Sequence, residues 1–274
     1  MGNKADHPVF DHGIISYFLI AFCTLSAASI GGLVVAVVFK FLLPGFDYGA
    51  ATGIGTAIAS LVMALAFWFY FRKDGCKSIL NGHKFLWAFL MMLPFLAVHY
   101  AGSFLSWRQF GFSGQFVTSL LAALAPGFGE EMAFRGLGIA NYLRNAKDGK
   151  DIRTIFWISS VTFGLVHIMN ISAGGDVLAS CIQSVYAIGI GMILGAIYIR
   201  TGNLWPTIIA HTSLDYLEFL RGDLEASGGV MTGLGLGDWV TIAASAIGAV
   251  IALFLMNKKH DVEILALWKK KWGQ

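Results

Sequence analysis

The chain has 274 residues, of which 57% are apolar and only 13% are charged, and its formal net charge is +3. Soluble domains carry roughly twice that share of charged residues, so the composition excludes a soluble protein and predicts an integral membrane protein. The small net charge does not indicate a nucleic-acid partner.

Eight apolar segments are long enough to cross a membrane, given that a transmembrane helix needs about 20 apolar residues. In chain order they cover residues 14–39, 50–71, 85–106, 116–143, 154–173, 177–199, 203–220 and 238–256. The sequence therefore predicts an all-α, polytopic transmembrane helix bundle of about eight spans, which forms one integral membrane domain over residues 1–274. We expect no cleavable signal peptide, because the first segment exceeds the length of a signal-peptide core.

Lysine and arginine residues are concentrated in the loops on one side of these segments. The other side carries only Lys40, Arg108 and Arg221. Because cytoplasmic loops are enriched in basic residues, we expect both termini to be cytoplasmic. The compact length and the lack of a targeting segment favour a prokaryotic plasma membrane.

Glycine and proline mark two special places in these helices. Pro126, Gly127 and Gly129 interrupt the fourth segment, which predicts a bent or broken helix there. Gly191 and Gly195 form a G-x-x-x-G pair in the sixth segment, which predicts a face that another helix can approach closely.

The C-terminal residues 257–274 are expected to be a basic cytoplasmic tail. Apolar and basic residues alternate at roughly helical spacing over residues 261–271, with Trp268 and Trp272 among lysines. This pattern is compatible with a helix on the anionic membrane surface and equally with a solvated tail.

Glu130, Glu131 and Arg135 are the only charged residues between Arg108 and Arg144. An unpaired charge at this depth in a membrane costs roughly 2.5 to 3.5 kcal/mol on insertion scales, so such residues indicate a functional site. Glu131 and Arg135 have the i, i+4 spacing of a helical ion pair, which leaves Glu130 as the freer carboxylate.

Polar residues in three other segments lie at comparable depth. His167, His211 and Asp215 lie about 16 to 22 Å along their helices from the basic residue that flanks each helix, and Glu130 lies about 21 Å from Arg144. They could therefore converge on one cavity within the catalytic core helices, residues 116–220. His99 reaches a similar depth in the third segment but belongs to no motif.

Two carboxylates and two imidazoles in an apolar environment suit general acid–base chemistry, such as peptide hydrolysis. Hydrolysis also needs donors for the developing oxyanion. The i, i+4 spacing of His211 and Asp215 places both side chains on one face of a helix, where they could serve this purpose.

Three sequence motifs carry a family resemblance. The run Pro126-Gly-Phe-Gly-Glu-Glu-Met-Ala-Phe-Arg-Gly136 resembles the E-E-x-x-x-R motif of the CPBP (CAAX protease and bacteriocin-processing, or Abi) family of intramembrane endopeptidases. Phe163-Gly-Leu-Val-His167 is similar to the F-x-x-x-H motif of that family, and His211-Thr-Ser-Leu-Asp215 to its H-x-x-x-N/D motif.

The resemblance implies a metal-independent glutamic endopeptidase without a cofactor. Glu130 and His167 would activate water, His211 and Asp215 would stabilise the oxyanion, and Glu131 with Arg135 would form a supporting ion pair. Relatives often have Asn in place of Asp215, and an ionised aspartate cannot donate a hydrogen bond. Asp215 would therefore be protonated, orient His211, or help to bind a metal such as zinc.

The substrates implied are membrane-associated peptides or proteins, including prenylated CAAX-type tails, and the lipid bilayer is the other partner. Two alternatives remain from other functional classes: a non-proteolytic bacteriocin-immunity or scaffold protein, and a proton-coupled transporter or channel. A zinc-dependent membrane protease is a third possibility. Asp238 lies in a G-x-G-D sequence at the expected start of the last helix, where it is interpreted as a helix cap rather than a catalytic aspartate.

Overall fold

The computed structural model describes residues 7, 9–110, 115–220 and 235–274 of the chain. This part is all-α, without strands, as the sequence predicts. Its helices are α1 Ile14–Leu42, α2 Tyr48–Phe71, α3 Phe85–Phe110, α4 Phe116–Glu130, α5 Ala140–Leu143, α6 Gly149–Leu165, α7 Val177–Thr201, α8 Trp205–Phe219, α9 Leu236–Leu255 and α10 Asp261–Lys271. Short 3-10 turns and one π-helix join some of them.

Within the described residues, six helical segments are long and apolar enough to cross a membrane, so the chain is an integral membrane protein. They are Ile14–Leu42, Tyr48–Asp74, Phe85–Leu105, Gly149–Ser172, Val177–Thr201 and Leu236–Leu255. The expected number of eight spans is not confirmed. Helix α8 has 15 residues and a length of about 22 Å, which is shorter than a hydrocarbon core of about 30 Å.

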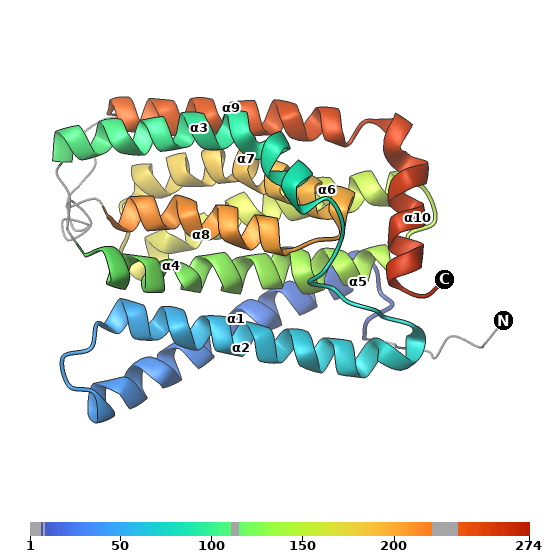
Figure 1. Ribbon diagram of the computed structural model, residues 1–274, viewed down its shortest axis with the longest axis horizontal. Coiled ribbons are helices and arrows are strands. Elements are labelled where there is room, and N and C mark those ends of the chain that lie inside the picture. The colour runs from blue at the N-terminus through green and yellow to red at the C-terminus, as the bar shows by residue number, and fades with distance from the viewer. Residues whose placement is uncertain (1–6, 8, 111–114, 221–234) are drawn as a thin grey trace.

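The long helices run roughly parallel or antiparallel and form one bundle (Figure 1). Helices α3 and α9 pack together, as do α6 with α7 and α1 with α2. Helix α4 lies between the α1–α2 pair and α8, and it contacts both. Helices α4 and α8, which carry Glu130, His211 and Asp215, are therefore neighbours inside the bundle.

The fourth predicted segment is continuous, and its winding changes later than expected. Helix α4 runs through Pro126 and Gly127 to Glu130 without a break. A π-helix, η2, then covers Glu131–Ile139, and α5 completes the segment. Because π-helices have wider i to i+5 turns and are frequent at functional sites, the irregular backbone lies on the motif itself.

Glycines permit close helix contacts around the motif residues. A Cβ at Gly127 would lie 1.9 Å from the Thr212 hydroxyl oxygen of α8. Gly191 of α7 faces Ser160 and Phe163 of α6, which confirms that the G-x-x-x-G face predicted in the sixth segment packs against another helix.

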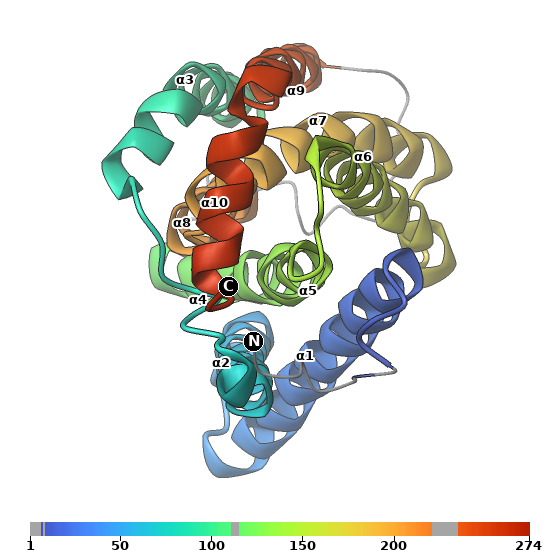
Figure 2. The ribbon, with the colours of Figure 1, turned by 90° about the vertical axis from the view of Figure 1, so that its right-hand side faces the viewer.

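The C-terminal residues are a folded part of the bundle. Helix α10 lies across one end of the other helices (Figure 2). Arg153 of α6 donates two hydrogen bonds to Asp261, at 2.8 and 2.9 Å, and the Trp268 indole donates to the Ile199 carbonyl at 2.9 Å. Both Trp268 and Trp272 are buried, so the tryptophans anchor the helix to protein.

Basic side chains gather at this same end. Lys84 and Arg200 pair with Glu263 of α10, and Arg144 pairs with Asp11 near the start of α1. The start of α1 and the C-terminal helix therefore lie at one end of the bundle. Of the basic residues used to predict topology, Lys4 and Arg221 and the side chain of Arg108 lie outside the described residues.

Candidate active site

A buried ion pair between Glu131 and Arg135 is part of the candidate site. The guanidinium of Arg135 donates to Glu131 Oε1 at 2.9 Å, and both side chains have 0% exposure. The pairing is the one expected from the i, i+4 spacing. Arg135 also donates to the Gly191 carbonyl at 3.3 Å and lies 4.0 Å from the centre of the Phe163 ring. These contacts fix the cation from three sides.

His211 links this ion pair to two further carboxylates. Its Nδ1 lies 3.0 Å from Glu131 Oε1, and its Nε2 lies 3.2 Å from Asp215 Oδ2 and 4.0 Å from Glu130 Oε2. His211 is buried. The E-E-x-x-x-R and H-x-x-x-D motifs, about 80 residues apart in sequence, therefore meet at one imidazole ring.

Glu130 forms no ion pair with an arginine among the residues that the structure describes. It ends α4, and its side chain is 20% exposed. Among the described residues, its buried Oε2 atom has no hydrogen-bond partner. An acid with an unsatisfied buried oxygen next to an imidazole can accept a proton from a bound water.

His167 approaches the same region from α6. It lies in η3, Val166–Ala173, and is half-buried. The Phe163 ring contacts the His167 ring and the His211 ring, each at 5.6 Å between centroids. Phe163 therefore packs against both imidazoles, and it also supports Arg135.

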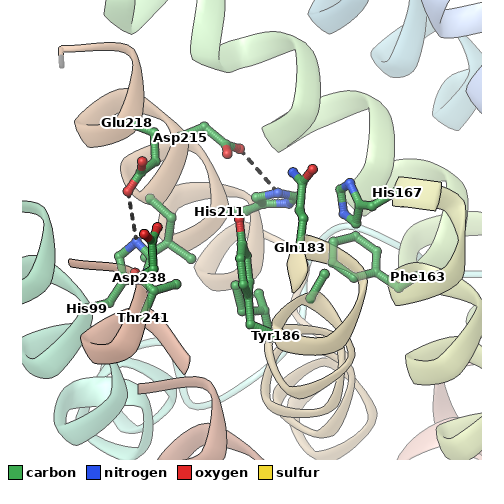
Figure 3. A pocket seen from close by; sticks show the side chains of 13 residues that line it. His99, Phe163, His167, Gln183, Tyr186, His211, Asp215, Glu218, Asp238 and Thr241 are labelled. Atoms are coloured by element: carbon green, nitrogen blue, oxygen red, sulfur yellow. Dashed lines mark ion pairs between the residues drawn. The ribbon is translucent and has the colours of Figure 1, made fainter. Parts of the chain in front are cut away.

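A cavity of about 180 Å³ opens beside these residues. Figure 3 shows His167, His211 and Asp215 on one side and His99, Glu218 and Asp238 on the other. His99 Nε2 lies 3.9 Å from Glu218 Oε1. Of the residues named from the sequence, His167, His211 and Asp215 line the cavity, whereas Glu130, Glu131 and Arg135 are not among its lining residues. His99, which belongs to no motif, also lines it.

Several site contacts were not foreseen from the sequence. The bond between His211 and Glu131 joins distant segments and has no local signal. Glu218 carries a weak signal, because it lies seven positions after His211 on the same helix face. Asp238 caps the start of α9 by accepting from the Gly235 N–H at 2.8 Å, and it also faces the cavity.

The described residues contain no group of three or more His, Cys, Asp or Glu side chains positioned to hold a metal ion. The Asn170 amide donates to Gln183 Oε1 at 2.9 Å across the η3–α7 contact.

Residues 112–217 match the sequence model of a family described as type II CAAX prenyl endopeptidase Rce1-like. This segment is similar to the Rce1-like CAAX protease family. The Rce1-like segment runs from the start of α4 to α8 and contains all three motifs, so the resemblance drawn from them is confirmed. No curated protein and no solved structure gives a significant match to the chain.

Proposed function

We propose that the chain is an intramembrane endopeptidase that hydrolyses peptide bonds of membrane-associated substrates, including prenylated CAAX-type tails. The Rce1-like match supports a membrane protease. The observation that carries the proposed chemistry is the position of Glu130, which forms no ion pair with an arginine among the described residues and lies 4.0 Å from the His211 imidazole, a ring that lines the cavity.

In the proposed reaction Glu130 is the general base. A water between Glu130 and the scissile carbonyl loses its proton to the carboxylate as its oxygen attacks carbon. His167 holds this water together with Glu130, and the proton later passes to the leaving amine. General acid–base catalysis of this kind contributes typically 10² to 10⁴ in rate.

His211 is the proposed donor to the oxyanion. A carboxylate accepts hydrogen bonds only, so Nδ1 must carry a proton to bond with Glu131 at 3.0 Å. Three carboxylate groups surround the ring, which favours an imidazolium whose Nε2 also carries a proton. That second proton can face Asp215 across the 3.2 Å ion pair in the resting state and bond to the oxyanion during hydrolysis.

The Glu131–Arg135 pair has a positioning role in this scheme. It touches neither water nor substrate, since both side chains have 0% exposure. Glu131 instead holds the His211 ring through Nδ1, and Arg135 neutralises the buried carboxylate. A fixed ring is required because oxyanion donors act through preorganisation.

The function can be tested with purified protein in detergent and two fluorogenic peptides, one prenylated at a C-terminal cysteine and one not. We expect cleavage of at least one peptide, with the rate unchanged by a zinc chelator. A rate abolished by the chelator and restored by zinc would support the zinc-dependent alternative. The scaffold alternative would be supported by two results together. Neither peptide would be cleaved, and cells that carry the Glu130→Gln protein would keep the wild-type phenotype.

A further inference from the structure

A second pocket lies at the end of the bundle where α10 crosses the other helices. It has a volume of about 240 Å³ and lies between α10 and the loop that joins α2 to α3. Lys77, His83, Lys270 and Lys271 supply its charged or titratable side chains, and Ser78 supplies a hydroxyl. Among the described residues, no Asp or Glu lines this basic pocket.

The ammonium group of Lys271 is held by two hydrogen bonds, which leave one of its N–H donors available. Its ammonium donates to the Asn81 carbonyl at 2.8 Å and to the Gly202 carbonyl at 2.6 Å. An ammonium has three N–H donors, so a third remains for a ligand. Burial lowers the pKa of Lys271 to about 8; the charged form still predominates at neutral pH, and an adjacent anion would favour it further.

The loop that forms the other wall is preorganised. The Lys77 N–H donates to the Lys271 carbonyl at 3.0 Å, and the His83 N–H donates to the Thr201 carbonyl at 3.0 Å. The Trp205 indole donates to the Asn81 side-chain oxygen, also at 3.0 Å. A ligand in this pocket would therefore order few additional groups, which favours its binding.

The position of the pocket indicates that the anion is a lipid headgroup. The second candidate span ends at Asp74 and the third begins at Phe85, so the loop lies at the level of lipid headgroups. Phe85 and Leu86, just beyond His83, are 46% and 71% exposed. These apolar side chains would face the acyl chains of a lipid whose headgroup lies among the lysines.

We propose that this basic pocket binds the phosphate of an anionic phospholipid headgroup and joins α10 to the α2–α3 loop. The site lies apart from the catalytic cavity and does not depend on the proposed protease chemistry. Basic pockets between transmembrane helices are suited to anionic headgroups, and each lysine near the surface adds to the attraction.

The test compares two double variants of the full chain that remove the same charge. Lys77→Gln with Lys270→Gln changes the pocket, whereas Lys258→Gln with Lys259→Gln changes exposed lysines in the turn before α10. Native mass spectrometry and thermal unfolding in detergent measure binding of phosphatidylglycerol, phosphatidylcholine and inorganic phosphate. All four lysines are exposed, so both variants should unfold at the wild-type temperature without lipid.

We expect phosphatidylglycerol to bind and stabilise wild type, and phosphatidylcholine to do so much less. The pocket variant should lose roughly 30-fold in phosphatidylglycerol affinity, and the control variant less than about 3-fold. Equal losses in both variants would overturn the proposal in favour of diffuse attraction. Inorganic phosphate that binds as tightly as the lipid would also overturn it, since the site would then recognise a free anion.

Discussion

Asp215 is the residue whose chemistry departs most from the family pattern. It lies 3.2 Å from His211 Nε2, where an asparagine could accept through its oxygen and donate through its amide. We expect Asp215→Asn to retain activity within about 10-fold of wild type. Asp215→Ala should lose about 10² to 10³, the cost of an oxyanion donor, because His211 would no longer be oriented to donate.

Steady-state cleavage rates of the two Asp215 variants check this prediction. Equal losses in Asp215→Asn and Asp215→Ala would mean that the negative charge itself is required, and the proposed role in oxyanion binding would be wrong.

We expect the loss of Arg135 to lower the free energy of unfolding, because Arg135 has a structural role and does not touch the substrate. Arg135→Met leaves Glu131 fully buried without its main counter-charge, and breaking a buried pair typically costs about 3 to 5 kcal/mol. Arg153→Met is a matched control, because its ion pair with Asp261 is 19% to 30% exposed and should contribute about 1 kcal/mol or less. Unfolding in mixed micelles measures both losses. A loss in Arg135→Met no larger than in the control would contradict the prediction.

At the scale of elements, the contact between α4 and α8 sets the distance between Glu130 and His211. A Cβ at Gly127 would lie 1.9 Å from the Thr212 hydroxyl and 3.1 Å from the Thr212 Cα, so Gly127→Ala must separate the helices. A displacement of about 1 Å can cost about 10²-fold in rate. We expect the variant to remain folded and to lose activity on this order.

Gly195→Ala is the control for this substitution, because the nearest atom to its Cβ, the Ser160 hydroxyl oxygen, lies at 3.9 Å. Cleavage rates should separate the two variants by at least about 10-fold. Similar rates in both would show that the α4–α8 spacing does not control the site.

The helices themselves follow closely from the apolar runs in the sequence. The segment expected at 116–143 corresponds to α4 through α5, and the one expected at 177–199 corresponds to α7. The π-helix over Glu131–Ile139 was not predicted, because its winding depends on contacts of the motif with other helices. The docking of α10 was missed for the same reason: its bonds to Arg153 and Ile199 join distant segments.

Part of the candidate site could also be predicted locally. Helical spacing alone gives the Glu131–Arg135 pair and the shared face of His211 and Asp215. The bond between Glu131 and His211, and the contact of the Phe163 ring with both imidazoles, depend on how helices pack. Spacing within one helix cannot supply such contacts.

For the whole molecule, the distribution of basic residues predicts the orientation in the membrane. Lys150 lies at the basic end near α10, whereas Lys40 ends α1 at the opposite end, and both are exposed. In a background with Cys23, Cys76 and Cys181 changed to alanine, we expect Lys150→Cys to react with an impermeant maleimide only from the cytoplasmic side. Lys40→Cys should react only from the other side. The reverse pattern would contradict the predicted orientation.

The proposed mechanism of peptide hydrolysis depends on Glu130 acting as the base that activates water. The most direct measurement is the cleavage rate of the Glu130→Gln protein, with Glu263→Gln on α10 as a control for loss of a carboxylate far from the site. We predict a loss of at least about 10² in Glu130→Gln and nearly wild-type rates in Glu263→Gln, with both proteins folded. A Glu130→Gln protein that cleaves peptide at the wild-type rate would contradict the assignment.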